Sequence, residues 1–260
     1  MFQRTRDRHV LLLTDFDGTL SDLVDNPGEA HLSVDVATEV SAIAKLPRVT
    51  FGLVSGRRIA DVHARVGSAA AFTAGLHGLE IDAADAEFRH PALEVVRPIV
   101  ASVVARARMD LAKYPRVFIE DKTYSVTCHV RGVHPDAIET ALDRFVEIAA
   151  PHVHAGVVKF LAAAEALELL PSTAWNKGRA VNWIRDHLTP RAARALSVVY
   201  LGDDRTDEDA FAVLGDDDVA IGVGERPHDP AIDWRLAGPA SVGRFFRHLT
   251  RLRRHPPDRL

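Results

Sequence analysis

Two aspartates stand two residues apart directly after an apolar run near the start of the chain. The run HVLLL leads into TDFDGTL, which holds Asp15, Asp17 and the turn-forming residues Gly18 and Thr19. Because side chains two apart on an extended segment point to the same side, both carboxylates can reach one site. Two negative charges at the edge of an apolar core repel each other and lose hydration. The pair therefore predicts a site at which positive charge compensates it.

A second acidic cluster follows another apolar run, in the segment YLGDDRTDED. Ligands of open α/β sheets bind beyond the carboxyl ends of the strands, so two acidic strand ends can meet in one crevice. Carboxylate oxygens are the ligands that hard divalent cations prefer. We therefore expect a bound Mg²⁺, which would neutralise part of the clustered charge. The carboxylates of this second cluster are Asp203, Asp204, Asp207, Glu208 and Asp209.

Two other element boundaries carry groups that attract anions. In LVSGRR, Ser55 and Gly56 end an apolar strand and precede a helix. A hydroxyl, free backbone N–H groups and a helix N-terminus together suit a phosphate. In WNKGRAV, Lys177 stands at the start of a helix, where its charge opposes the helix dipole. A lysine at that position indicates that it holds something negative.

Each of these segments is also common as a plain turn or cap, and the prediction depends on their joint order along the chain. A cation site, an anion site and a free carboxylate in one crevice are the parts needed for phosphoryl transfer. One carboxylate can attack phosphorus and form an aspartyl-phosphate. A second carboxylate can protonate the leaving alcohol and later activate water.

Both ends of the chain alternate continuous apolar strands with helical patterns, which is typical of a parallel sheet covered on both faces. We predict an α/β fold with a Rossmann-like parallel-sheet core formed by residues 1–90 and 172–260. The expected strands are HVLLLTD, VTFGLVS, LSVVYLGDD and DVAIGVG, and the expected helices are SVDVATEVSAIAKL, GRRIADVHARVG, NKGRAVNWIRDHL, EDAFAVLG and SVGRFFRHLTRL. The charged run GDDDVAIG (215–222) is expected to be a solvated loop before a strand.

The middle of the chain has another pattern, a helix and a strand pair that occur twice in succession. We therefore predict that residues 91–171, bordered by Pro91 and Pro171, form an inserted α+β cap domain. The segments RVFIEDK and TYSVTCHVRG are expected to form a hairpin, and VHAGVVKFLAA and EALELLP two further strands.

One predicted cap strand, TYSVTCHVR, alternates cleanly between apolar and polar side chains. Its apolar residues point to one face, and its polar residues to the other. The polar row is either a solvent-facing surface or a surface with the donors that a polyol needs, and the alternation leaves both interpretations open. The polar row consists of Ser125, Thr127, His129 and Arg131.

Composition narrows the class of protein. The chain has 260 residues, 47% of them apolar, and a formal net charge of −4, so nonspecific nucleic-acid binding is not expected. Cys128 is the single cysteine, which excludes intramolecular disulfides and thiolate metal clusters. Since no apolar stretch approaches the ~20 residues that span a bilayer, we expect a soluble cytoplasmic protein without membrane contact. We expect it to be a monomer.

The motifs and their order resemble those of a known superfamily. DFDGTL, SGR, NKG and GDDRTDED resemble the four motifs of haloacid-dehalogenase-like phosphatases, and the inserted cap resembles the type found in sugar phosphatases. The closer resemblance, over nearly the whole chain, is to the trehalose-6-phosphate phosphatase family. GLHGLEI (75–81) resembles that family's HGxE segment, and EDKTYSVTCHVR resembles its cap motif. This resemblance implies a Mg²⁺-dependent phosphatase that hydrolyses trehalose 6-phosphate to trehalose and phosphate through an aspartyl-phosphate.

The resemblance also implies a role for each motif residue. Asp15 would be the nucleophile and Asp17 the general acid and base. The metal would be held by Asp15, the Asp17 backbone carbonyl and Asp203, with Asp204 and Asp207 supporting them. Ser55, Gly56 and Lys177 would hold the phosphoryl group. The sugar-binding residues of the cap would be Glu120, Lys122, Ser125, His129, Arg131 and Glu168, and Arg57 and His77 are further substrate-binding candidates.

The sequence departs from the family pattern at two places, and several alternative functions stay open. Ser21 and Asp22 stand where the family often has a proline, and Leu170 stands where it often has an arginine in the last cap strand. The second departure leaves the sugar open, so phosphatases of sucrose, glucosylglycerol or mannosylglycerate phosphate are alternatives. A phosphomutase, a sugar-phosphate sensor without catalysis, and a phospho-accepting receiver are alternatives of other classes. Product analysis separates a mutase from a phosphatase, since a mutase releases no phosphate.

Overall fold

The computed structural model describes residues 5, 7–24, 26–163, 165–189, 195–225 and 232–254. The chain divides into two compact units. We call Met1–Phe88 with Trp175–Leu260 the core, and Arg89–Ala174 the cap. Among the described residues, no helix is long and apolar enough to cross a membrane.

The core is built on a sheet with the strand order β12-β11-β10-β1-β2-β3-β4-β5. Neighbouring strands from β12 to β3 run parallel, and β4 pairs with β3 in the antiparallel direction. The predicted α/β class with a parallel-sheet core is therefore confirmed. The strands are β1 (His9–Thr14), β2 (Val49–Val54), β3 (Phe72–Gly75), β4 (Glu80–Ala83), β5 (Glu87–Arg89), β10 (Leu196–Gly202), β11 (Val219–Val223) and β12 (Trp234–Leu236).

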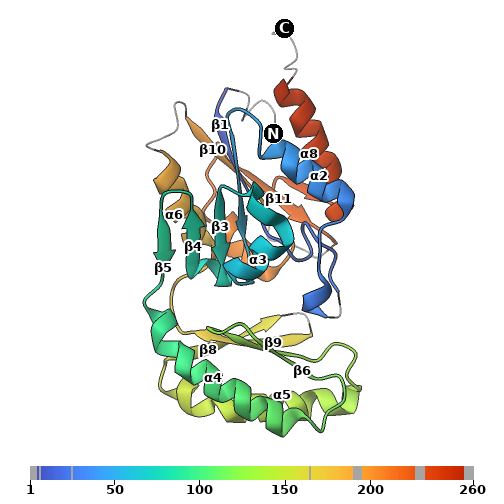
Figure 1. The fold of residues 1–260 in the computed structure, drawn as a ribbon, viewed down its shortest axis with the longest axis vertical. Coiled ribbons are helices and arrows are strands. Elements are labelled where there is room, and N and C mark those ends of the chain that lie inside the picture. The colour runs from blue at the N-terminus through green and yellow to red at the C-terminus, as the bar shows by residue number, and fades with distance from the viewer. Residues whose placement is uncertain are drawn as a thin grey trace. The chain divides into compact units, whose positions relative to one another are not determined.

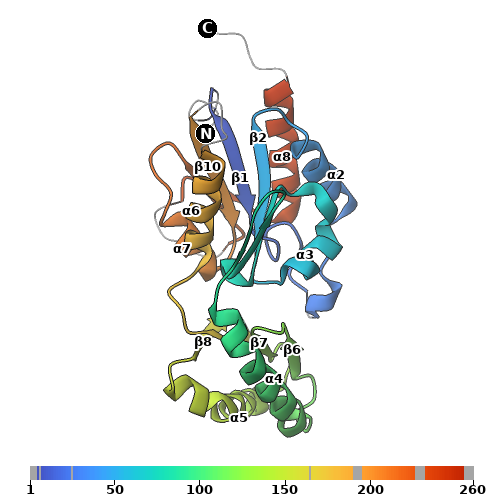
Figure 2. The same ribbon diagram turned by 60° about the vertical axis from the view of Figure 1, so that its left-hand side comes forward.

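Helices cover both faces of this sheet, as Figure 2 shows. On one face lie α2 (Val34–Ile43), α3 (Ile59–Val66) and α8 (Pro239–Arg254), and on the other α6 (Lys177–Leu188) and α7 (Arg205–Phe211). Alternate residues of β1 pack against the helices on the two faces of the sheet. Val10 and Leu12 pack in the cluster with α2 and α8, whereas Leu11 and Leu13 pack in the cluster with α6. This two-sided burial explains why β1 is an uninterrupted apolar run.

The strand register brings the predicted site segments to one edge of the core sheet. Thr14, the last residue of β1, pairs with Leu201 of β10 on one side and with Leu53 of β2 on the other. The segments that follow these three strands begin with Asp15, Asp203 and Ser55. They therefore leave the sheet side by side at its carboxyl edge, where α/β proteins bind ligands.

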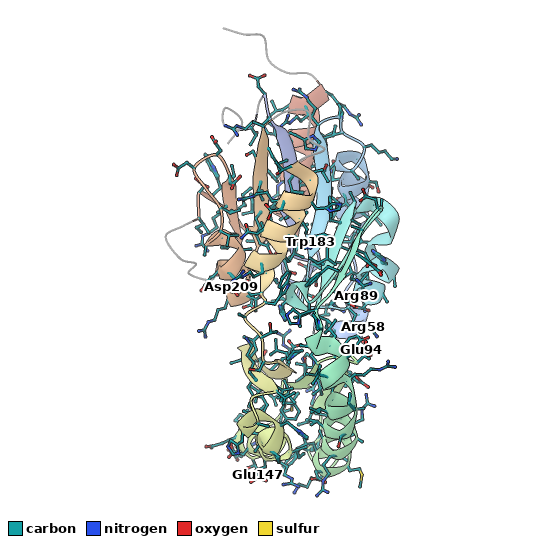
Figure 3. The ribbon with its side chains drawn as sticks, turned by 90° about the vertical axis from the view of Figure 1, so that its left-hand side faces the viewer. Arg58, Arg89, Glu94, Glu147, Trp183 and Asp209 are labelled. Carbon is teal, nitrogen blue, oxygen red and sulfur yellow. The ribbon has the colours of Figure 1, made fainter. Side chains whose placement is uncertain are left out.

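Helix α6 is held against the core by aromatic side chains and by its N-cap. Trp183, labelled in Figure 3, stacks on His187 with ring centroids 5.2 Å apart and lies 6.1 Å from Phe88. At the other end, the Asn176 side chain accepts a hydrogen bond of 3.0 Å from the Arg179 N–H. These contacts fix the first residue of α6, which is Lys177.

The cap is a four-stranded antiparallel sheet with two helices along one face. Its strand order is β6-β7-β9-β8, which confirms the predicted hairpin and the later strand pair. In Figure 1, α4 and α5 lie side by side beneath the sheet. The elements are α4 (Ala92–Leu111), β6 (Phe118–Asp121), β7 (Val126–His129), α5 (Pro135–His154), β8 (Val158–Ala163) and β9 (Ala166–Pro171).

The two faces of the cap sheet differ in character. The helix-covered face carries Ile119, Val126, Cys128 and Leu169, which join the α4 and α5 side chains in one apolar cluster. The opposite face carries the polar row, and we call it the polar cap face. It is formed by Phe118, Glu120, Thr127, His129, Ala166 and Glu168, which the register places side by side.

Candidate active site

Asp15 is a buried carboxylate held at the end of β1. It is 6% exposed, and its backbone N–H donates to the Leu201 carbonyl at 2.9 Å. Its Oδ1 accepts from the Phe16 N–H at 2.7 Å, and its Oδ2 pairs with Lys177 Nζ at 2.9 Å. Both oxygens are thus oriented by groups of the core, as a carboxylate nucleophile requires.

Lys177 lies between two carboxylates and is 1% exposed. Besides Asp15, its Nζ binds Asp207 Oδ1 at 2.8 Å. The Tyr200 hydroxyl donates to that same oxygen at 2.7 Å. A lysine at a helix N-terminus is therefore explained here by two buried anions that outweigh the opposing helix dipole.

Asp207 is a hub for hydrogen bonds. Its Oδ2 accepts from the backbone N–H groups of Asp203 at 3.1 Å and Asp204 at 3.0 Å. Together with Lys177 and Tyr200, these donors occupy the roughly four lone-pair positions of a carboxylate. Although oxygens of Asp15, Asp203 and Asp207 lie within 4.8 Å of one another, Asp207 is committed to protein donors. Its role is to position Lys177 and the backbone before α7.

Burial changes the protonation equilibria of this cluster. Burial raises the pKa of the Asp15 carboxyl well above its usual range, and Lys177 acts against this shift. Burial and the neighbouring Asp207 raise the pKa of Asp203 to about 7. For Lys177, burial favours the neutral amine, but Asp15 and Asp207 outweigh it, so its pKa is raised. Lys177 alone therefore does not offset the burial and the mutual repulsion of these carboxylates.

Asp17 has a separate cationic partner. Arg57 Nε donates to Asp17 Oδ2 at 2.6 Å, and its Nη2 donates to Asp17 Oδ1 at 2.7 Å. The guanidinium also donates to Asp61 at 2.7 Å and to the Pro27 carbonyl at 2.8 Å. A two-point contact of this kind fixes the orientation of a carboxylate. Arg57, a predicted substrate-binding candidate, directs these donors to protein oxygens, and it holds Asp17.

The turn after Asp17 brings Asp203 next to the first acidic pair. Gly18 has φ +75°, and a Cβ at this position would overlap the Asp203 carboxylate. The Thr19 hydroxyl donates to Asp203 Oδ1 at 3.0 Å. Glycine and threonine of DGT therefore have distinct tasks. The glycine gives the backbone its turn and leaves space for Asp203, and the threonine orients that carboxylate.

Ser55, Gly56 and His77 lie together in the loop after β2. The Ser55 side chain is 1% exposed, and its Oγ accepts from the Arg57 N–H at 3.1 Å. A Cβ on Gly56 would lie 2.8 Å from the His77 ring, so the ring packs against this glycine. His77 has φ 57°, a strained value for a residue with a side chain. The HGxE segment thus packs against the SGR loop through the His77 ring.

The residues present fit a divalent cation. Asp15, Asp17, Asp203 and Asp207 bring four carboxylates, and Lys177 and Arg57 bring two cations. When all six side chains are ionised, two negative charges remain in excess among them, which one divalent cation would balance. Asp15 and Asp203 supply the all-oxygen donors that Mg²⁺ prefers. Asp204 is the N-cap of α7 and lies outside the group of three close carboxylates.

The polar cap face brings the predicted sugar-binding residues together in pairs. Glu120 binds His129 Nε2 at 2.9 Å, and Glu168 accepts from Ser125 Oγ at 2.7 Å and from Lys122 Nζ at 3.2 Å. Arg131 Nε donates to Glu165 at 2.8 Å. Ser125 and Thr127 are only 2% and 4% exposed, so the solvent-facing interpretation of the polar row is wrong for these two residues.

Three functional side chains were missed by sequence reasoning. Tyr200 orients Asp207, Thr19 orients Asp203, and Asp61 holds Arg57. Tyr200 lies in a continuous apolar run, where a tyrosine gives no signal of its own. Asp61 does give a signal, because it follows Arg57 by four residues, which is the spacing of a helical ion pair.

Comparisons with known proteins agree with the fold and the motifs. A structure from Bacteroides thetaiotaomicron described as a haloacid dehalogenase-like hydrolase matches with a TM-score of 0.64 and 15% identity, over 93% of this chain and 100% of that chain. The C-terminal domain of C. albicans trehalose-6-phosphate phosphatase matches with a TM-score of 0.78 and 22% identity, over 96% of this chain and 95% of that chain. The core and its inserted cap therefore have the fold of haloacid-dehalogenase-like hydrolases.

Sequence comparison then narrows the class to one family. The profile of the family described as Trehalose-phosphatase matches residues 13–231. The chain belongs to this trehalose-phosphatase family. A Trehalose-phosphate phosphatase from Mycobacterium tuberculosis is 35% identical over 263 residues, which is 97% of this chain and 64% of that protein. This chain thus spans about 64% of the length of that curated relative.

Proposed function

We propose that this chain is a Mg²⁺-dependent phosphatase that hydrolyses trehalose 6-phosphate to trehalose and phosphate. The observation that carries the proposal is that the two aspartates have different cationic partners. Asp15 is held by Lys177 at 2.9 Å, and Asp17 is held by Arg57 at 2.6 and 2.7 Å. Two carboxylates in different environments suit two different tasks, nucleophile and acid–base catalyst. Membership of the trehalose-phosphatase family favours trehalose 6-phosphate among the sugar phosphates.

The first half of the reaction transfers the phosphoryl group to Asp15. A carboxylate oxygen of Asp15 attacks phosphorus, and the bond from phosphorus to the sugar oxygen breaks. Asp17, in its acid form, gives its proton to the leaving oxygen, so the sugar departs as an alcohol. Ser55 and Lys177 bind the phosphoryl oxygens during the transfer. When bound, Mg²⁺ would be held by Asp15, Asp203 and the Asp17 carbonyl, and it would offset the charge of the carboxylates and the phosphoryl group.

The second half of the reaction regenerates the enzyme. Asp17, now ionised, takes a proton from a water molecule as that water attacks phosphorus. The bond from phosphorus to Asp15 breaks, inorganic phosphate leaves, and Asp17 is protonated again for the next turnover. The two-point contact with Arg57 orients the ionised carboxylate of Asp17 for this step.

The sugar is recognised by the polar cap face in this proposal. Glu120, Lys122, His129 and Glu168 offer charged donors and acceptors that match sugar hydroxyls. Release of phosphate from a panel of sugar phosphates, with Mg²⁺ and with EDTA, tests the proposal. We expect trehalose 6-phosphate to give the highest kcat/KM and EDTA to abolish turnover. Higher kcat/KM with another glycosyl phosphate, or isomerised substrate without free phosphate, would contradict it.

Replacing Arg57 by Ala is expected to remove general acid catalysis. Without its two-point partner, Asp17 loses its fixed position, so kcat/KM for trehalose 6-phosphate should fall on the order of 100-fold. 4-Nitrophenyl phosphate has a leaving group that needs little protonation, and its kcat/KM should fall less than about threefold. The measurement is the ratio of the two kcat/KM values, because kcat/KM reports only the steps up to loss of the leaving group.

Arg65→Ala is the matched control for Arg57. Arg65 lies on α3, the helix that follows Arg57, and pairs with the same Asp61 at 2.9 Å, whereas the two oxygens of Asp17 are taken by Arg57. The ratio of the two kcat/KM values should therefore be unchanged in Arg65→Ala. An equal loss for both substrates in Arg57→Ala would show that Arg57 supports the fold or binds phosphate instead.

A further inference from the structure

The hydroxyl of Thr127 is a buried polar group on the polar cap face. Thr127 lies on β7 and is 4% exposed. Within the part of the chain that the structure describes, its Oγ1 is buried and has no hydrogen-bond partner. Buried hydroxyls in folded proteins nearly always have a partner, so an exception calls for an explanation such as a ligand.

The strand register places Thr127 at the centre of the polar cap face. It pairs with Glu120 of β6 on one side and with Glu168 of β9 on the other. Side chains of directly paired residues lie on the same face, with Cβ atoms roughly 5 Å apart. The Thr127 hydroxyl therefore stands in a short row between two carboxylates.

Both flanking carboxylates are turned away from Thr127. Glu120 binds His129, whose cross-strand neighbour is Phe118, and Glu168 binds Ser125 and Lys122 toward the other end of the hairpin. The two glutamates thus lean in opposite directions along the sheet. The hydroxyl between them is left with two acceptors close by that are already engaged.

We propose that Thr127 is a specificity residue that hydrogen-bonds a hydroxyl of the sugar, which rests on the proposed function and extends its sugar site. A sugar hydroxyl both donates and accepts, so it can accept from Thr127 and donate to a flanking glutamate at the same time. The cap motif that resembles that of sugar phosphatases includes Ser125 and His129 and assigns no role to the three residues between them, of which Thr127 is the one with a polar side chain on the polar cap face.

The charges of the polar cap face favour a neutral polar ligand. Lys122 lies 3.2 Å from Glu168 and 4.0 Å from Glu120, and His129 lies 2.9 Å from Glu120. Since each carboxylate has a nitrogen donor as partner, the row offers donors beside acceptors, which match hydroxyl groups better than they match a metal ion or an anion. Phe118, 47% exposed and 5.8 Å from the His129 ring, adds an apolar surface beside the row. Polar groups beside an aromatic ring match a pyranose, which carries both C–H and O–H groups.

The test replaces Thr127 by Val, which removes the hydroxyl and keeps the shape. We expect KM for trehalose 6-phosphate to rise about five- to tenfold with kcat within twofold, because the contact is made to a sugar hydroxyl that takes no part in the bond changes at phosphorus. The inhibition constant of inorganic phosphate, which lacks a sugar, should stay unchanged. The melting temperature should not fall, because the free protein loses no hydrogen bond at this position.

Thr127→Ser is the matched variant, since it keeps the hydroxyl, and its KM should stay within twofold of the wild-type value. An unchanged KM in Thr127→Val would overturn the sugar contact. A rise in KM accompanied by an equal rise in the phosphate inhibition constant, or by a lower melting temperature, would also overturn it in favour of a structural role. A wild-type protein that turns over no sugar phosphate would overturn the proposed function, and the sugar contact with it.

Discussion

Replacing Asp15 by Asn is expected to reduce phosphate release by about 10⁴-fold or more. The amide keeps the size of the side chain but cannot attack phosphorus, so the covalent route is closed. The surrounding groups that orient Asp15, the Phe16 N–H and Lys177, remain in place. The measurement is steady-state phosphate release from trehalose 6-phosphate by the purified variant in the presence of Mg²⁺.

Asp209→Asn is the control that separates nucleophilic attack from a general loss of negative charge. Asp209 belongs to the same acidic cluster of the sequence but is exposed on α7, as labelled in Figure 3. Its removal should change kcat/KM less than about twofold. Acid-quenched wild-type protein should carry phosphate on the peptide that contains Asp15, and the Asp15→Asn protein should carry none. Turnover of Asp15→Asn at the wild-type rate would contradict the assignment of the nucleophile.

The fold was predictable because the burial of each element leaves a recognisable pattern of apolar residues in the sequence. The strands β1, β2, β10 and β11 are buried on both faces and therefore read as continuous apolar runs. The cap strand β7 has one face packed on helices and one polar face, so it alternates. Both patterns are local consequences of burial, and burial is what sequence periodicity records.

The members of the candidate site were predictable for a related reason. Asp15, Ser55, Lys177 and Asp203 each stand at an element boundary, and parallel strands bring their carboxyl ends to one edge. What the sequence could not give is the pairing of charges. The sequence predicts positive charge near Asp15 and Asp17, but it does not say that Lys177 goes to the first and Arg57 to the second. That assignment depends on side-chain packing between elements far apart in the chain.

The acidic run before β11 likewise shows that the sequence does not predict the partners of a charged side chain. Residues 215–217 are exposed, as expected for a solvated loop, but Asp218 is 8% exposed and the expectation is wrong there. Its carboxylate accepts from the Val198 N–H at 2.7 Å and the Gly215 N–H at 2.9 Å, and it pairs with Arg185 at 2.7 Å. Composition alone cannot separate a solvated aspartate from one that closes a loop against a neighbouring strand, because the partners come from other segments.

Replacing Lys177 by Met is expected to lower the free energy of unfolding by about 3–5 kcal/mol at pH 7, because two buried carboxylates lose their shared cation. Lys177 is fully within the core and pairs with Asp15 and Asp207 at 2.9 and 2.8 Å. The measurement is urea denaturation in EDTA, so that wild type and variant are compared without metal. Lys45→Met, which removes an exposed lysine at the end of α2, should change the free energy by less than about 0.5 kcal/mol.

The pH dependence of this loss distinguishes lost charge compensation from lost packing. Burial raises the pKa of Asp15 and Lys177 opposes that shift, so the variant should raise this pKa further. A carboxyl whose pKa is higher in the folded state than in the unfolded state binds more protons when folded, so stability rises as the pH falls. The difference between wild type and Lys177→Met should therefore shrink from pH 7 to pH 5. A difference that stays constant over this range would mean that Lys177 contributes through packing, and the buried charge pairs would not then be what holds the Asp15 site together.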